Sequence, residues 1–184
     1  VNADAEEMAA YMEAQLTQSY QVYAKRSTAY YERLIKEYAS DGGILKIYKK
    51  DGKITDIKIA AEAEEVDGGK PKIMIRIVDV RRMLMSLKLK SLMAVSFQIT
   101  DPLIPENNRY VTMTGTEFSG LMLMDGKPET SEGILSVSAL GELVFGAKTV
   151  EEISKEEGVS MSGRMASELE KIIPLSRIYL NEAV

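Results

Sequence analysis

The sequence contains no cysteine and no histidine. Without cysteine, the chain can form no disulfide, thiolate nucleophile or sulfur-ligated metal site. Without histidine, it can form no Ser-His-Asp triad, Cys-His dyad or imidazole-ligated zinc or iron site. A general acid or base within this chain must therefore be Asp, Glu, Tyr, Lys or a chain terminus.

Long apolar runs and Gly-rich phosphate loops are also missing. No stretch of about 18 uncharged apolar residues occurs, so we expect no membrane span. The N-terminal segment is acidic and lacks the basic-then-apolar pattern of a signal peptide, so we expect a cytoplasmic protein. Gly42-Gly43 and Gly68-Gly69 are bare pairs without a following helix start, and they indicate a helix end and a linker.

The charge of the chain is unevenly distributed. The 184 residues carry a net charge of −5, yet residues 70–90 hold seven basic side chains and one acidic side chain. A nucleic-acid site would require aromatic side chains for stacking beside these charges, and this segment has none. We interpret the cluster as a solvated surface that neutralises the acidic flanks, and we expect no nucleic-acid partner.

The stretch from Lys70 to Leu84 changes its hydrophobic period halfway. Ile73, Ile75 and Ile77 alternate as in a strand. From Val80 onward the apolar residues follow a helical period, and Asp79 stands where its carboxylate can cap a helix. This pattern predicts a strand leading into a short helix at the start of the main domain.

Residues 1–69 are predicted to form two helices and one hairpin. The helices are expected over 3–18 and 28–39, the strands over 44–48 and 54–59, and Asp51-Gly52 between the strands is typical of a two-residue turn. Two helices and a hairpin form a thin core. We therefore expect this region to be part of a larger domain or to pack onto the rest of the chain.

Residues 70–184 are predicted to form the α+β part of the chain. Further strands are expected at 91–100, 109–114, 118–124 and 134–137, and helices at 138–145, 149–157 and 162–173. The expected fold is a mostly antiparallel sheet of about five strands with helices on one side. The semi-apolar tail 175–184 is unusual for a frayed end, which predicts that something covers it.

Methionine and tyrosine are the remaining candidates for a binding site. The methionines of the second region could line a tunnel for an apolar ligand, or they could fill an ordinary core; they are Met83, Met85, Met93, Met113, Met122 and Met124. The tyrosines of the first region could flank a cleft, or they could pack with their hydroxyls at the surface; they are Tyr20, Tyr23, Tyr30, Tyr31 and Tyr38. The carboxylate pairs Glu151-Glu152 and Glu156-Glu157 fit a polar helix face, so no metal site is expected.

Three segments resemble Eis-like acetyltransferases of the GNAT family. They are Ile73-Met74-Ile75-Arg76-Ile77-Val78-Asp79-Val80, Ser138-Ala139-Leu140 with Leu143-Val144-Phe145-Gly146, and Ile173-Pro174-Leu175-Ser176-Arg177-Ile178. Residues 20–60, with Arg26, Tyr30-Tyr31 and Gly42-Gly43, resemble the second acetyltransferase lobe of that family more loosely. The resemblance implies a partial second lobe over 1–69 and a sterol-carrier-like domain over 70–184.

The resemblance also implies a function. The intact protein would be an acetyl-CoA-dependent N-acetyltransferase that acts on amine groups, and this region would help to shape the substrate site and a homo-oligomer interface. The acetyl-CoA-binding lobe, with its Arg/Gly-rich loop, has no counterpart here, so the resemblance implies an upstream lobe as partner and a chain that is inactive alone.

Within this chain the resemblance assigns catalysis to the terminal carboxylate of Val184 as the base. A merely docked tail is the alternative. Two other functions stay open, a non-catalytic module that holds a lipid or other apolar ligand, and a purely structural assembly domain.

Overall fold

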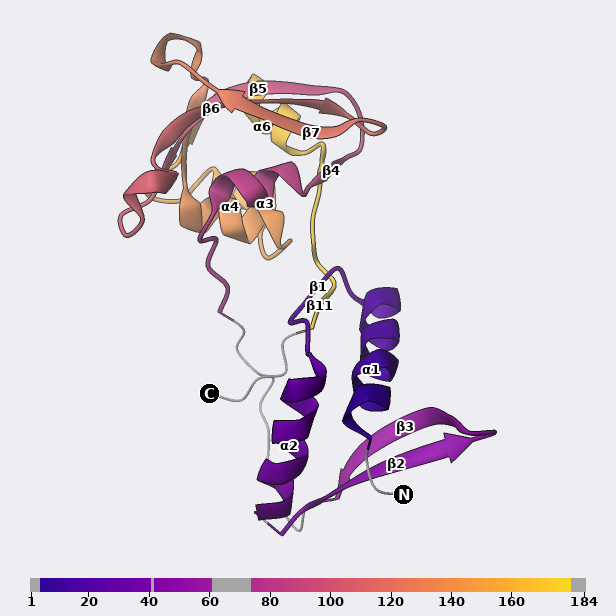
Figure 1. The fold of residues 1–184 in the computed structure, drawn as a ribbon. Coiled ribbons are helices and arrows are strands. Elements are labelled where there is room, and N and C mark those ends of the chain that lie inside the picture. Colours follow the sequence, from indigo (N-terminus) through magenta and orange to yellow (C-terminus); the bar gives the residue numbers. More distant parts are fainter. Residues whose placement is uncertain (1–3, 41, 61–73, 180–184) are drawn as a thin grey trace. The chain divides into compact units, whose positions relative to one another are not determined.

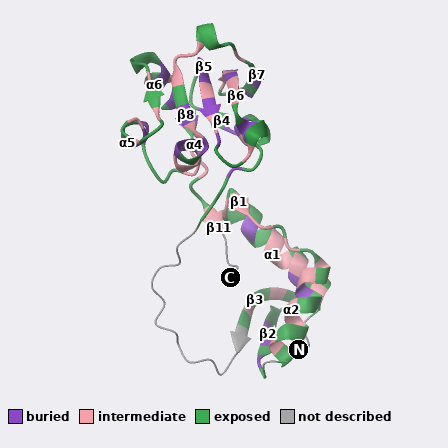
Figure 2. Ribbon diagram, turned by 90° about the vertical axis from the view of Figure 1, so that its left-hand side faces the viewer, coloured by how far each residue is buried: buried purple, intermediate pink, exposed green. Residues whose placement is uncertain are grey.

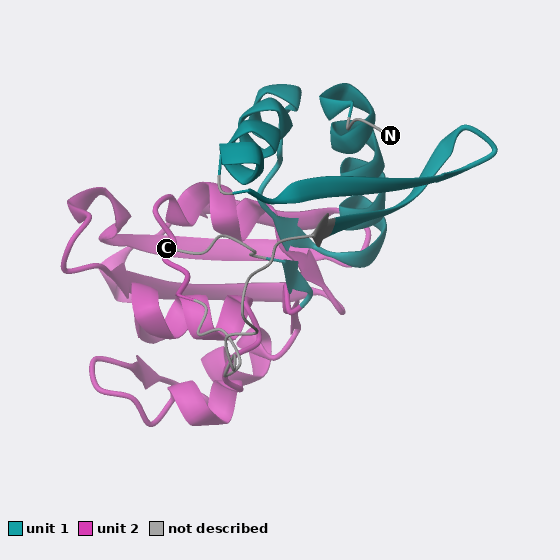
Figure 3. Cartoon of the chain, turned by 90° about the horizontal axis from the view of Figure 1, so that it is seen from below, with its two compact units in different colours: residues 1–73, 177–184 teal, residues 74–176 magenta. Residues whose placement is uncertain are grey.

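The chain forms two units, coloured separately in Figure 3, and each is described by itself. The computed structural model describes residues 4–40, 42–60 and 74–179. The first unit is Val1–Ile73 with Arg177–Val184, and the second is Met74–Ser176. The expected boundary at residue 69 lies outside the described residues, so the division into 1–69 and 70–184 stays a prediction.

The order of elements along the chain can be followed in Figure 1. The helices are α1 Ala5–Ser19, α2 Thr28–Ser40, α3 Val80–Met85, α4 Val137–Val144, α5 Val150–Ile153 and α6 Gly163–Leu169, with 3-10 turns η1 Pro105–Asn107 and η2 Pro128–Thr130. The strands are β1 Val22–Tyr23, β2 Ile44–Lys50, β3 Lys53–Ala60, β4 Lys88–Leu89, β5 Met93–Thr100, β6 Arg109–Thr116, β7 Gly120–Asp125, β8 Gly133–Ser136, β9 Ser160–Met161, β10 Ile172–Ile173 and β11 Ile178–Tyr179.

The first unit contains the predicted pair of helices and the predicted hairpin. Asp4 caps α1, because its carboxylate accepts from the amides of Glu6 at 2.9 Å and Glu7 at 3.1 Å. Asp51 and Gly52 both have positive φ, 52° and 77°, as a two-residue turn of this type requires. A small core of Met8, Tyr31, Leu45 and Ile47 joins α1, α2 and β2.

The second unit is built on a five-stranded sheet with the strand order β7-β6-β5-β8-β9. All neighbouring strands are antiparallel except β5 and β8, which are parallel. β5 has a strictly alternating pattern, since Met93, Val95, Phe97 and Ile99 are buried and the residues between them are not. The predicted α+β class, with a mostly antiparallel sheet of about five strands, is confirmed.

The inner face of this sheet carries the core. Figure 2 shows buried residues on β5 and α4. Phe97 is 0% exposed, and α3 and α4 contribute Val80, Leu84 and Leu140 to the same cluster. The outer face keeps its small polar residues, and Ser96 and Thr112 join across it through their hydroxyls at 2.8 Å.

The predicted strand over Ile73–Ile77 is wrong in its described part. Met74 to Val78 form no strand, and of these residues only Ile77 is buried. Alternation alone cannot make a strand, because the backbone also needs a neighbouring strand to pair with. The fifth strand of the sheet is instead β9, which has only two residues.

Several predicted helix ends are also wrong. α4 begins at Val137, one residue earlier than expected, with Ser136 as its cap, and α5 stops at Ile153, four residues before its expected end. The helix expected to reach Ile173 ends at Leu169, after which Ile172 and Ile173 pair with β4. α5 begins with a capping box, since Thr149 and Glu152 satisfy each other's backbone amides.

Candidate functional site

The first unit gathers aromatic rings around one cation. The guanidinium of Arg26 lies 4.9 Å from the ring centroid of Tyr30 and 5.7 Å from that of Tyr179. Tyr20 packs on Tyr179 at 5.0 Å, and Tyr31 meets Tyr30 edge-on at 5.2 Å. We call these five residues the Arg26 cluster. It is the candidate functional site of the chain because it joins a charge, several hydroxyls and aromatic faces in one place.

Three short segments position the cluster. α1 ends at Ser19, so Tyr20 is extended and contributes its ring at the helix end. Arg26 stands just before α2, whose first turn supplies Tyr30 and Tyr31.

The last segment comes from the far end of the chain. β11 pairs in parallel with β1, with Tyr179 opposite Tyr23, and the two strands lie side by side in Figure 1. The amide of Arg177 donates to the Gln21 side chain, and the amide of Gln21 donates to the Arg177 carbonyl at 2.7 Å.

Tyr31 is the buried member of the cluster, with 2% of its surface exposed. Burial raises the pKa of the Tyr31 hydroxyl above its ordinary value, and the positive charge of Arg26 beside it opposes that rise. The phenol of Tyr31 therefore stays protonated at neutral pH, and it can donate or accept a hydrogen bond but holds no charge.

The other tyrosines of the first unit serve different contacts. The Tyr23 hydroxyl lies 2.7 Å from the hydroxyl of Thr17 and 3.2 Å from a carboxylate oxygen of Glu13. Tyr38 packs against the small core of the unit. Of the five tyrosines named from the sequence, the structure brings Tyr20, Tyr30 and Tyr31 together around Arg26. No sequence pattern could reveal Tyr179 as their partner.

Val184, the predicted catalytic residue, lies outside the described residues. The description of the chain ends at Tyr179. The role of the Val184 carboxylate therefore stays a prediction.

A second polar centre, in the second unit, surrounds Asp101. Its carboxylate accepts from the Asn107 side chain at 2.9 Å and from the amides of Leu103 and Ile104, and it pairs with Arg76. Burial would raise the pKa of Asp101, but these hydrogen bonds and the nearby guanidinium lower it to about 2. Asp101 is therefore a fixed anion at neutral pH and cannot act as a base there.

This centre is structural. The side-chain oxygen of Asn107 accepts from the amide of Val80 at 3.2 Å, and its amide group donates to the carbonyl of Val78 at 3.4 Å. The centre thus holds the start of α3 and the segment before it. This role of Asp101 was not predicted from the sequence, where Asp101-Pro102 is only a dipeptide typical of turns.

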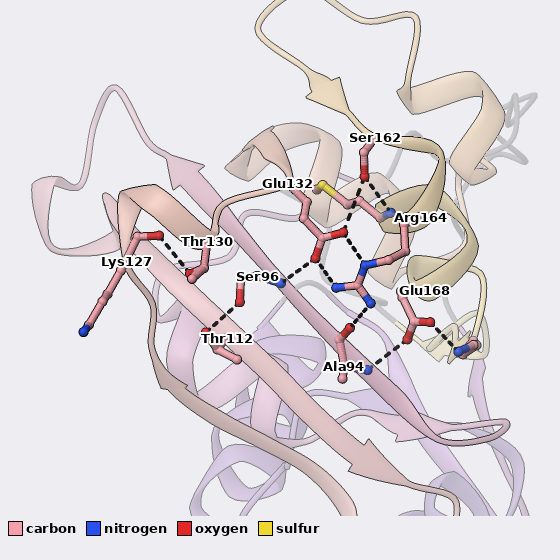
Figure 4. A network of polar contacts seen from close by, with 11 residues as sticks. Ala94, Ser96, Thr112, Lys127, Thr130, Glu132, Ser162, Arg164 and Glu168 are labelled. Carbon is pink, nitrogen blue, oxygen red and sulfur yellow. Dashed lines mark hydrogen bonds and ion pairs between the residues drawn. The ribbon is translucent and has the colours of Figure 1, made fainter.

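A third network lines the first half of β5 (Figure 4). Glu132 accepts from Arg164 and from the amide of Ser96, and Arg164 also donates to the carbonyl of Ala94. Glu168 accepts from the amide of Ala94 at 2.9 Å. These side chains take the place of a neighbouring strand along this edge, which is a structural task.

The basic side chains of residues 74–90 make polar contacts within the second unit. Arg76 pairs with buried Asp101, Arg81 lies 3.7 Å from Asp125, and Lys90 donates to the carbonyl of Glu170. Two of these contacts, those of Arg76 and Arg81, are to acidic side chains as expected. Lys70 and Lys72 lie outside the described residues.

The methionines of the second unit do not lie together along one tunnel. Met93 and Met113 are fully buried in the core, whereas Met85, Met122 and Met124 are about half exposed. Side chains that point to opposite faces of the sheet cannot enclose one tunnel. This distribution gives the apolar-ligand alternative no support from the methionines.

Two kinds of site are absent from the described part of the chain. Residues 4–40, 42–60 and 74–179 contain no group of acidic side chains placed to hold a metal ion. Among the same residues, no helix has the length and apolar content to cross a bilayer.

The fold of the second unit defines an α+β domain of the sterol-carrier type. The family model described as "Sterol carrier protein domain" matches residues 80–181. Because this match covers more than half of the chain, the protein belongs to that family.

The chain is also similar to parts of two solved structures. One is a conserved protein of unknown function from Enterococcus faecalis, described as a probable N-acyltransferase, with 20% identity and a TM-score of 0.51 over 67% of this chain and 30% of that one. The other is a GCN5-related N-acetyltransferase from Anabaena variabilis, with 16% identity and a TM-score of 0.49 over 56% of this chain and 26% of that one. The chain thus spans about a third or less of either protein. No curated protein matches the sequence.

Proposed function

We propose that this chain is the C-terminal part of an acetyl-CoA-dependent N-acetyltransferase of the Eis-like GNAT type that acts on amine groups. The observation that carries the proposal is the extent of the fold likeness to the Enterococcus faecalis protein. It covers 67% of this chain, which is more residues than the second unit, Met74–Ser176, contains. The likeness therefore includes part of the first unit as well as the sterol-carrier-type domain.

In this proposal acetyl-CoA supplies the activated acetyl group and binds to a lobe outside this sequence. The described residues do not fit the cofactor, since the glycine pair within them, Gly42-Gly43, ends α2 and does not open a helix toward a pyrophosphate. In this proposal the chain helps to form the binding site of the amine substrate. An amine arrives mainly as an ammonium ion and must lose a proton before its nitrogen can attack.

The proposed base is the terminal carboxylate of Val184. A carboxylate can accept the ammonium proton if a partly dry site raises its pKa. The pairing of β11 with β1 ties the tail to the first unit as far as Tyr179, five residues before Val184, which supports a specific placement of the tail.

The test is acetyl transfer from acetyl-CoA to amines by the intact protein, with two variants of its end. Deletion of Ala183-Val184 removes the carboxylate from its position and should lower kcat by about 10²-fold or more, as expected for loss of a general base. Val184→Ala keeps the carboxylate in place and is the matched control, which should retain most of the activity. Full activity of the deletion variant would exclude Val184 from the mechanism.

We also propose that the outer face of the five-stranded sheet takes part in a homo-oligomer interface. Met122, Met124 and Ile134 are exposed large apolar residues on this face, and such residues often mark interaction sites. Met122→Lys should lower the mass measured by light scattering after size-exclusion chromatography. Met74→Lys, at a position that is 94% exposed and outside the sheet, is the control and should leave the mass unchanged.

A further inference from the structure

The β2–β3 hairpin of the first unit contributes only one of its two faces to the core. Leu45 and Ile47 of β2 are buried there. The alternate residues of β2 point to the other face, where Ile44 is 63% and Tyr48 is 47% exposed, and Lys46 between them is exposed as well. A hairpin is marginally stable unless its faces are packed, so the bare face is a candidate docking surface.

We call this bare face the outer hairpin face. Its residues alternate with the inward positions of each strand, and they are Ile44, Lys46, Tyr48 and Lys50 of β2 with Lys53, Asp56 and Lys58 of β3. Lys49 does not belong to it, because its ammonium pairs with Glu7 of α1.

Four lysines form two like-charged pairs on the outer hairpin face. Lys46 lies directly opposite Lys58, and Lys50 lies directly opposite Lys53. The Cβ atoms at such positions are about 5 Å apart, and like charges there destabilise the sheet. Lys58 has an acidic neighbour, since its Nζ lies 3.6 Å from a carboxylate oxygen of Asp56. The other three lysines have no side-chain hydrogen bond or ion pair within the part of the chain that the structure describes, so an acidic partner would relieve the repulsion.

The charge of the hairpin differs from that of the whole chain. Residues 44–58 hold five lysines and two aspartates, although the chain carries a net charge of −5. A basic surface attracts an acidic partner and repels a second copy of itself. Charge complementarity therefore favours an acidic partner and opposes self-association through this face.

The middle of the outer hairpin face distinguishes an acidic polypeptide from a nucleic acid. Asp56 lies opposite Tyr48 with its side chain 51% exposed, and its carboxylate would repel a phosphate at that point. Nζ of Lys58 lies 5.7 Å from the centroid of the Tyr48 ring. This cation occupies one side of the single aromatic ring that the outer hairpin face offers for base stacking. A polypeptide can instead place an apolar side chain against Tyr48.

We propose that the outer hairpin face docks an extended, acidic polypeptide segment of a partner protein. Successive outward residues of a strand lie about 7 Å apart, and an extended segment presents its own alternate side chains at the same spacing. Carboxylates of the segment contact Lys46 and Lys50, and an apolar side chain between them contacts Tyr48. The docking involves neither an acetyl group nor an amine substrate, so it does not depend on the proposed function.

The test is fluorescence anisotropy with the full chain at low salt. The probe is a fluorescein-labelled peptide in which glutamates and leucines take alternate outward positions and serines lie between them. The first reference is the same peptide with glutamine in place of glutamate. The second reference is a labelled single-stranded DNA of equal charge.

We expect the glutamate peptide to bind saturably and the glutamine peptide to bind about 10-fold more weakly or less. Binding should weaken as NaCl is added, because the charges that pair are exposed and are screened. Absence of saturable binding by the glutamate peptide, or equal binding of the two peptides, overturns the proposal. Tighter binding of the DNA also overturns it, since that result identifies a nucleic-acid surface.

A charge reversal separates the docking surface from the stability of the fold. Lys46→Glu places a carboxylate opposite Lys58, so it replaces a like-charged pair by an opposite pair and should keep or raise the thermal unfolding midpoint. The same variant should weaken binding of the glutamate peptide by about 10-fold or more, because it adds repulsion at the contact.

Lys36→Glu is the matched control. It makes the same charge change at an exposed position of α2 and should change the binding by less than about 2-fold. Equal losses of binding in Lys46→Glu and Lys36→Glu would overturn the proposal. Acetyl transfer plays no part in these measurements, so their failure and the failure of the proposed function can be told apart.

Discussion

Replacing Asp101 by Asn should destabilise the second unit by an amount that depends on pH. The carboxylate of Asp101 is buried and paired with Arg76. Its pKa falls from 3.8 to about 2 on folding. At 1.36 kcal/mol per pKa unit, the charged form contributes about 2 kcal/mol to the free energy of unfolding at pH 7.

The sign of the pH dependence follows from the lowered pKa. A group whose pKa is lower in the folded state stabilises the fold above its unfolded pKa, here close to 4, and this stabilisation is lost as the pH falls through about 2. Asp101→Asn should therefore lower the free energy of unfolding by about 2 kcal/mol at pH 7. The difference from the wild type should shrink as the pH is lowered from 4 to 2.

Hydrogen–deuterium exchange of peptides from β5 and β6 measures this stability within the second unit. Asp125→Asn is the matched control, because the Asp125 side chain is 87% exposed and lies 3.7 Å from Arg81. It should change the free energy of unfolding by less than about 0.5 kcal/mol. Equal effects of the two substitutions, or an Asp101→Asn effect that is undiminished at pH 2, would refute the reasoning.

Three further predictions concern the stability of the second unit. Gly146→Ala should lower the free energy of thermal unfolding by about 1–2 kcal/mol, because φ of Gly146 is +71°. Gly141→Ala, inside α4, is the control and should raise that free energy by about 0.5–1 kcal/mol. Equal effects of the two substitutions would contradict this reasoning. Phe97→Ala should cost about 3–5 kcal/mol in chemical unfolding, and Phe118→Ala, at 91% exposure, should be nearly neutral. Arg164→Gln removes the donors that Glu132 and the carbonyl of Ala94 accept from. It should therefore speed amide exchange in the first half of β5, and unchanged exchange there would exclude its edge-pairing role.

Much of the fold could be predicted because its signals are local. β5 alternates along its whole length, Asp51-Gly52 specifies a two-residue turn, and Thr149 with Glu152 forms a capping box. Each depends on residues within a few positions of one another. The α+β class follows from the order of such elements.

The remaining elements depend on distant partners. Ile73, Ile75 and Ile77 alternate, but no strand pairs with the described part of that segment. Ile172 and Ile173 continue a helical pattern, yet they pair with β4. A period shows which face of an element is apolar and not which neighbour its backbone will find.

The candidate site was only partly predictable for the same reason. The tyrosines were visible in the sequence as a group, and the resemblance included Arg26 and Tyr30-Tyr31. The packing of Tyr179 on Tyr20 and Arg26 follows from the pairing of β11 with β1. Two-residue strands carry too little pattern to reveal that pairing.

The most direct test of the proposed function is the transfer of acetyl groups from acetyl-CoA to amines, measured for the product of the full open reading frame and for this chain alone. We expect turnover by the full product and none by residues 1–184. The absence of turnover by the full product with a broad set of amines, or turnover by this chain alone, would contradict the proposed function.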